Sequence, residues 1–201
     1  MRFDRFEVTI FPDVYPPSED SYLLLDAIRF TTADSVLDVG CGAGLVSLMA
    51  HDRARLVVSI DRSLEAVRNT RTNLDKNGFA SSAMVFQADL LTALRPDALF
   101  SVIAFNPPYL PEEDNHSDMD HALIGGPEGT ETTLRFLEQA VPHLRYDGRI
   151  YVVASSLSNM DKVRKRMEDL GLNVDLVAEQ KMFFETLVVL QGTCRHKETV
   201  L

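Results

Sequence analysis

The sequence has little of what secreted and membrane proteins need. Its 201 residues include only two cysteines, Cys41 and Cys194, too few for a disulfide framework, so a reducing compartment is expected. No stretch approaches the roughly 18 consecutive apolar residues of a membrane span. The N-terminal MRFDRFEVTIFPD carries charges and a proline where a signal peptide needs an apolar run. We therefore expect a cytoplasmic protein.

The chain also has no surplus of positive charge. It carries 30 acidic residues against 20 Lys and Arg, for a net charge of −10. Proteins that hold nucleic acid by its phosphates usually present a basic face, so this balance disfavours nucleic acid as a ligand without excluding a local patch. The one basic cluster, Lys162–Arg166, falls on an expected helix and is interpreted as a solvated face.

The composition is that of an ordinary globular protein. Hydrophobic residues make up 45% and charged residues 25%, which excludes disordered, collagen-like and coiled-coil chains. At roughly 100 to 200 residues per domain, the length predicts a single domain over residues 1–201.

Short apolar runs alternate with longer amphipathic segments along the chain. Runs rich in Val and Ile are expected to be buried strands: Ser35–Val39, Arg55–Ile60, Ala83–Gln87, Leu99–Phe105 and Arg149–Ala154. Amphipathic segments are expected to be helices: Ser18–Phe30, Leu45–His51, Ser63–Asn77, Thr130–Leu144 and Asn159–Leu170. This alternation indicates a parallel sheet with right-handed crossovers. Two last strand-like runs, Asn173–Ala178 and Glu185–Leu190, leave no room for a helix, so a hairpin should add one antiparallel strand.

A glycine-rich turn follows the first expected strand and precedes a helix. It reads Asp-Val-Gly-Cys-Gly-Ala-Gly from Asp38 to Gly44, and Gly40, Gly42 and Gly44 let a ligand approach the backbone closely. The spacing is not the G-x-G-x-x-G of dinucleotide-binding proteins, and Asp38 would repel a pyrophosphate. A ligand with a positive end, such as S-adenosylmethionine, fits this turn better.

Three carboxylates follow the first three expected strands. Asp38 suits a cationic group, Asp61 can accept both hydroxyls of a ribose, and Asp89 can accept from an adenine amino group with Leu90 against the ring. Taken singly, each has an equally good structural explanation. Asp38 could be a strand-end cap, Asp61 a helix N-cap ahead of Ser63, and Asp89 a turn residue. Their common place at the carboxyl ends of successive parallel strands favours a bound nucleoside.

The fourth expected strand ends in Asn106-Pro107-Pro108-Tyr109. Two prolines fix the backbone and keep their carbonyl groups while removing both N–H donors. This rigid wall fits a planar –NH2 group, with one hydrogen on the Asn106 oxygen, one on the Pro107 carbonyl, and Tyr109 stacked on the plane. The alternative is a proline-stopped strand with Asn106 as a turn former.

At this point the chain resembles the class I S-adenosylmethionine-dependent methyltransferases. More narrowly, it resembles the HemK-type glutamine methyltransferases of class 1 translation termination factors, in their archaeal and eukaryotic branch. The motifs that carry the resemblance are Val14–Asp26, the glycine-rich turn, Asn106–Tyr109, Gly125–Gly129 and Phe184–Leu187. The Tyr-x-Pro-x-Glu-Asp-Ser/Thr opening is the more specific signal, because the Asn-Pro-Pro-Tyr motif is shared with adenine methyltransferases.

The resemblance implies a fold, a cofactor and a set of site residues. The fold is Rossmann-like α/β, with a seven-stranded, mostly parallel sheet and an antiparallel C-terminal hairpin strand. The cofactor is S-adenosylmethionine, and its contacts would be Ser21, Asp38, Gly40, Gly42, Asp61, Asp89, Leu90 and Asn106. The catalytic residues would be Asn106, Pro107, Pro108 and Tyr109, of which Asn106, Pro107 and Tyr109 would bind substrate. The Asp114–Pro127 stretch is expected to be an active-site flap.

The expected reaction is N5-methylation of the glutamine in the Gly-Gly-Gln motif of a class 1 release factor. The alternatives are N6-methylation of adenine in DNA or RNA, a protein lysine substrate, and a binding module that has lost activity, against which the intact wall argues. We expect no general base and no metal, since the histidines have no catalytic or ligand spacing. The resemblance also implies a small zinc-binding activator protein, which we expect to pair with an apolar edge strand at Ala83–Phe86.

Overall fold

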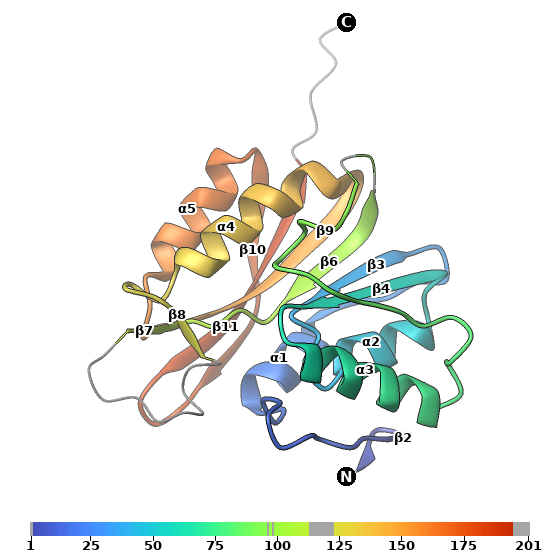
Figure 1. The fold of residues 1–201 in the computed structure, drawn as a ribbon. Coiled ribbons are helices and arrows are strands. Elements are labelled where there is room, and N and C mark those ends of the chain that lie inside the picture. Colours follow the sequence, from blue (N-terminus) through green and yellow to red (C-terminus); the bar gives the residue numbers. More distant parts are fainter. Residues whose placement is uncertain (1, 96, 98, 113–122, 195–201) are drawn as a thin grey trace, which may run out of the picture.

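The computed structural model describes residues 2–95, 97, 99–112 and 123–194 (Figure 1). The part of the expected flap from Asp114 to residue 122 lies outside the described residues, as do His116, His121 and His196. No helix in the described part of the chain is long and apolar enough to cross a membrane.

A seven-stranded sheet in the order β10-β11-β9-β6-β3-β4-β5 forms the centre of the molecule (Figure 1). Its strands are β3 (Ser35–Val39), β4 (Leu56–Asp61), β5 (Met84–Gln87), β6 (Phe100–Phe105), β9 (Leu144–Ser155), β10 (Leu172–Lys181) and β11 (Thr186–Cys194). Neighbours from β5 to β9 pair in parallel, whereas β11 runs antiparallel to both β9 and β10. The predicted sheet, including its antiparallel strand in the C-terminal hairpin, is confirmed.

Helices cover both faces of the sheet (Figure 1). They are α1 (Glu19–Ala27), α2 (Leu45–His51), α3 (Leu64–Lys76), α4 (Glu131–Ala140) and α5 (Met160–Asp169). Because successive strand residues point to opposite faces, Val36 joins the core beneath α1, α2 and α3, while Leu37 joins the core beneath α4 and α5. Burial on both faces explains why the central strands are rich in Val, Ile and Leu.

The main difference from the expected elements lies after α4. The helix expected over Thr130–Leu144 stops at Ala140 and becomes a 3-10 turn over Val141–His143. Pro142 lies in this turn and has no N–H to continue an α-helix. The following strand β9 therefore begins at Leu144, earlier than expected. Four short strands were also not expected: β1 (Arg2–Phe3), β2 (Phe6–Glu7), β7 (Leu110–Pro111) and β8 (Ile124–Gly126).

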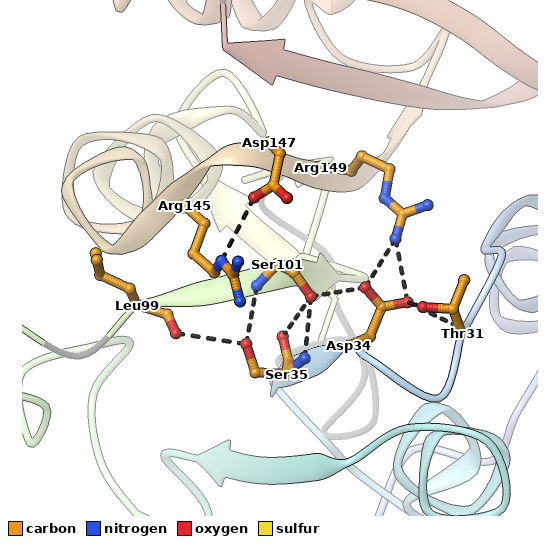
Figure 2. Close-up of polar contacts among 8 residues, drawn as sticks. All are labelled: Thr31, Asp34, Ser35, Leu99, Ser101, Arg145, Asp147 and Arg149. Atoms are coloured by element: carbon orange, nitrogen blue, oxygen red, sulfur yellow. Dashed lines mark hydrogen bonds and ion pairs between the residues drawn. The ribbon is translucent and has the colours of Figure 1, made fainter.

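A buried polar network joins the amino ends of β3 and β6, at the far end of these strands from the carboxyl edge (Figure 2). Asp34 accepts hydrogen bonds from Thr31 and Ser101 and forms an ion pair with Arg149 at 3.0 Å. Ser35 and Ser101 exchange backbone-to-hydroxyl bonds. Burial alone would raise the pKa of Asp34, but these hydrogen bonds and Arg149 hold the pKa below its usual value. The network locks the starts of two central strands together.

Three asparagines on α3 hold the extended N-terminal segment Glu7–Phe11. The side chains of Asn77, Asn73 and Asn69 bond the backbone of Glu7, Thr9 and Phe11 at 2.7 to 3.0 Å. The asparagines are four residues apart on the helix, which is an advance of about 6.0 Å, and their partners are two residues apart in an extended segment, which is an advance of about 6.6 Å. The spacing of the side chains therefore matches the spacing of the backbone groups that they bond. The asparagines thus act as a strand partner, and they fix the segment that leads to Asp13–Pro17 beside the cavity described below.

We predict that Asn73→Ala lowers the free energy of unfolding by about 2 to 4 kcal/mol, because it removes hydrogen bonds to Thr9 and to the Ala43 carbonyl and leaves buried groups unpaired. Asn77→Ala is the matched control and should cost about 1 kcal/mol, since water reaches that end of the ladder. Urea denaturation measures both values. Equal losses in the two variants would contradict a buried ladder centred on Asn73.

Candidate active site

The predicted site residues come together around one cavity of about 400 Å³, a size that suits a small-molecule ligand. It lies at the carboxyl ends of β3, β4 and β6, where open α/β sheets bind ligands. The lining includes Ser21, Asp38, Gly40, Gly42, Asp61, Asp89, Leu90, Asn106, Pro107 and Pro108. Of the predicted residues, only Tyr109 is not part of this lining.

The glycine-rich turn has the backbone geometry that its sequence indicates. Gly40, Gly42 and Gly44 all have positive φ, and a Cβ on Gly40 would lie 2.9 Å from the Phe105 ring. Asp61 holds the turn in place, because its Oδ2 accepts from the Gly42 N–H at 3.0 Å. Its Oδ1 accepts from the N–H of Ser63, so the same side chain joins the turn to the start of α3. Asp61 is therefore a structural clamp as well as a candidate ligand residue.

Asp38 is buried at the start of this turn, and its carboxyl group has a raised pKa. Its Oδ2 accepts from both the N–H and the hydroxyl of Ser47, in the first turn of α2. Among the described residues, no donor bonds Oδ1. Burial raises the pKa of Asp38 to about 7, and the neighbouring Asp61 carboxylate adds to the rise. A cationic ligand group placed beside Asp38 would restore its charged form.

The third carboxylate, Asp89, lies at an open part of the cavity. It forms an ion pair with Arg135 of α4 at 2.6 Å, and Arg135 also lines the cavity. The next residue, Leu90, is buried and has φ of 52°, which is rare for a side chain of this kind. The sequence carries no signal for Arg135, because it falls on the polar face of an ordinary amphipathic helix.

Asn106 lines the cavity and carries a buried side-chain oxygen. Its Oδ1 is buried, and no hydrogen-bond donor in the described part of the chain reaches it. Leaving a buried acceptor unpaired costs about 1 to 3 kcal/mol. Asn106, Pro107 and Pro108 all line the cavity, so a ligand bound there would contact the residue that carries this oxygen. The role of these residues as an acceptor wall stays a prediction.

A glycine segment supports the wall from its other side. The short strand β8 pairs with β7, and the Leu110 N–H donates to the Leu123 carbonyl at 2.8 Å. A Cβ on Gly125 would collide with the carbonyl oxygen of Pro108, and one on Gly129 would collide with that of Tyr109. The backbones can approach this closely only because both residues are glycine. These contacts explain why Gly125–Gly129 accompanies the Asn-Pro-Pro-Tyr motif.

Tyr109 has contacts different from those expected. It is buried, and its hydroxyl donates to Asp20 Oδ2 at 3.2 Å; Tyr15 donates to the same oxygen at 3.3 Å. The other Asp20 oxygen accepts from the Ser21 hydroxyl at 3.0 Å. Burial and the Asp20 charge raise the pKa of Tyr15 to about 12 and raise that of Tyr109 further, so both tyrosines stay protonated donors. This geometry favours a positioning role for Tyr109 over the expected stacking on substrate.

Comparison with known proteins identifies the family of this chain. The model of the methyltransferase small domain matches residues 18–185. The putative protein N5-glutamine methyltransferase of Methanocaldococcus jannaschii is 32% identical over 196 residues, which cover 96% of this chain and 98% of that protein. The chain belongs to the HemK2/Mtq2 family of class I methyltransferases.

Two eukaryotic members of this family are also similar to the chain, one in sequence and one in structure. Human methyltransferase HEMK2 is 31% identical, over 91% of each chain. The solved E. cuniculi Mtq2, described as part of an Mtq2–Trm112 complex that methylates the termination factor eRF1, has a TM-score of 0.72 and 26% identity. That match covers 91% of this chain and 99% of the other. Both the predicted family and the predicted fold class are confirmed.

Membership of this family implies S-adenosylmethionine as the cofactor, and the cavity fits that molecule. The turn at Gly40 and Gly42 leaves backbone open to a ligand, and Asp38 suits its positive end. The burial of Cys41 raises the pKa of its thiol, in agreement with a small turn residue rather than a nucleophile.

We predict that S-adenosylmethionine binds more tightly as the pH rises from about 6 to 8. The pKa of Asp38 is raised, so its contribution to folding is fully present below its ordinary pKa of 3.8 and is lost as the pH rises through about 7. A cation bound beside Asp38 lowers this pKa, so binding near pH 6 should release up to one proton.

Calorimetry in two buffers of different ionisation enthalpy measures the released proton. Asp38→Asn is the control, because its amide oxygen can still accept from Ser47 but cannot titrate. The variant should bind more weakly and with no proton release. A wild-type affinity that does not change over this pH range would contradict the role given to Asp38.

Proposed function

We propose that the protein transfers a methyl group from S-adenosylmethionine to the side-chain nitrogen of the glutamine in the Gly-Gly-Gln motif of a class 1 translation termination factor. The observation that carries this proposal is the buried, unpaired Asn106 Oδ1 at the cavity wall. A carboxamide supplies two N–H groups, and the adjacent Pro107 carbonyl is a second acceptor in the same rigid segment. The curated relatives described above support a glutamine substrate.

The wall would activate a poor nucleophile by positioning it. The lone pair of an amide nitrogen is delocalised into its carbonyl group, so the nitrogen must become pyramidal before the lone pair is localised on it. Asn106 and Pro107 would accept both N–H bonds and aim that lone pair along one direction. The sulfonium of the cofactor supplies an activated methyl group. No base is needed beforehand, because the nitrogen becomes acidic only once it is methylated.

The site offers little to a lysine substrate. A lysine ammonium must lose a proton before it can act as a nucleophile, and the described cavity lining contains carboxylates but no histidine that could take it. The cations of the lining are Arg62 and Arg135, and Arg135 is paired with Asp89. These features favour an amide, which needs no prior deprotonation.

Adenine is the alternative substrate, since its amino group would meet the same wall. Its nucleic acid would need cations to hold phosphates. Three cations of the Lys162–Arg166 cluster instead pair with carboxylates: Lys162 with Glu128, Arg164 with Glu168 and Arg166 with Glu138. Together with the net charge of −10, this pairing favours a protein substrate.

We predict that Asn106→Ala binds S-adenosylmethionine within a few-fold of wild type and loses turnover on a termination factor by about 10²- to 10³-fold, because one acceptor of the wall is gone. Asn106→Asp keeps an acceptor of the same shape and should retain more turnover than the alanine variant. Methyl transfer to the factor and calorimetric cofactor binding measure the two effects. An alanine variant with wild-type turnover would rule out the wall mechanism.

The edge strand β5 is the proposed site for the small zinc-binding activator. β5 ends the strand order, and Met84 and Phe86 are 44% and 49% exposed on it. Val85 points to the other face and packs against the core. A free edge beside uncovered apolar side chains suits strand addition. The complex of E. cuniculi Mtq2 with Trm112 supports such a partner.

We predict that Phe86→Lys weakens binding of the activator by at least tenfold, because a charge replaces an exposed apolar side chain at the edge. Leu64→Lys, on an exposed side chain of α3, is the control and should bind as wild type does. Co-purification and titration of the activator measure the affinities. Wild-type binding by the Phe86 variant would place the activator elsewhere.

A further inference from the structure

The turn between β10 and β11 presents two phenylalanines to solvent. Phe183 and Phe184 are 92% and 85% exposed, and their rings pack edge to face with centroids 4.7 Å apart. No other large hydrophobic side chain in the described part of the chain is this exposed. Burying a phenylalanine usually stabilises a protein, and an exposed apolar pair marks an interaction surface.

This turn lies at the same end of the sheet as the cavity. Both β10 and β9 run antiparallel to β11, so β10 ends at the edge where β9, β6 and β3 have their carboxyl ends. Figure 1 shows the turn at the end of the sheet that also carries β7 and β8, the strands that support the Asn106–Pro108 wall. The aromatic pair therefore lies at the same end of the sheet as the cavity, on the edge opposite β5.

The residues around the pair hold it in a fixed position. The Met182 N–H donates to the Glu185 carbonyl at 2.8 Å and closes the turn. The Ser155 hydroxyl donates to the Glu185 carboxylate at 2.5 Å, and this joins the turn to the end of β9. Met182 packs on the core cluster that contains Tyr109. A pre-ordered aromatic pair loses little conformational entropy when it binds a partner.

We propose that Phe183 and Phe184 form a docking site for an apolar surface of the protein substrate, next to the loop that carries the target glutamine. This inference rests on the proposed function. The cavity of about 400 Å³ is too small for a folded protein, so most of a protein substrate would contact the surface around it, and the pair lies exposed at that end of the sheet.

The charges around the pair select a protein rather than a nucleic acid. Aromatic side chains that stack on single-stranded bases work beside a positive groove that holds the phosphates. The nearest cation in sequence, Lys181, faces Glu179 at 3.8 Å, and Glu185 adds a second negative charge at the turn. Exposed phenylalanines without such a groove fit an apolar protein surface.

The double variant Phe183→Ser/Phe184→Ser tests the docking site on the full chain with its activator. We expect the KM for an intact termination factor and its Kd to rise by about 10- to 100-fold, as for the loss of an aromatic anchor. The kcat and the Kd for S-adenosylmethionine should stay within about threefold, since neither side chain lines the cavity. Phe183→Leu/Phe184→Leu should restore part of the affinity.

The matched control is Leu176→Ser, an exposed apolar side chain on β10 of the same hairpin, which should leave the KM unchanged. A double variant with wild-type KM and Kd for the factor would overturn the docking site, as would a variant that loses only kcat. A wild-type enzyme that binds S-adenosylmethionine but does not methylate the factor would instead remove the proposed function, so the two failures can be told apart.

Discussion

One buried oxygen without a hydrogen bond, Asn106 Oδ1, is the atom on which the candidate site depends. A folded protein seldom leaves such an acceptor unpaired, because the cost is a sizeable part of its marginal stability. Two prolines fix the backbone that follows Asn106. Gly125 and Gly129 let a second segment lie in backbone contact with Pro108 and Tyr109.

The cofactor side of the cavity depends on buried carboxylates in the same way. Asp38 is dehydrated beside Asp61, and burial raises its pKa to about 7, so below pH 7 a cationic ligand would displace a proton from it. Asp61 also binds the Gly42 N–H, so the residue expected to hold the ribose is the one that shapes the turn. Preorganisation of this kind lets both ends of the cavity meet their ligands without rearrangement.

Local patterns in the sequence predict the strands of the sheet and most helix boundaries, because each depends on residues close together in the chain. The helix expected to begin at Ser63, for example, is α3, and the Ser63 side chain caps it. The site residues came from motifs that resemble those of a known family. Contacts between distant segments were not predictable in this way. The Tyr109–Asp20 hydrogen bond joins residues 89 positions apart, and the Asn69–Asn77 ladder pairs with a segment about 60 to 70 positions away. Arg135 likewise reaches Asp89 only through the packing of α4.

The most direct test of the account is the identity of the methylated atom. Purified enzyme and activator would be incubated with S-adenosylmethionine and an equimolar mixture of a class 1 termination factor and single- and double-stranded DNA and RNA. Tandem mass spectrometry of the digested protein and nucleosides then locates every added methyl group. The account predicts one methyl group on the side-chain nitrogen of the Gly-Gly-Gln glutamine. Methylated adenine, with that glutamine unmodified, would contradict it.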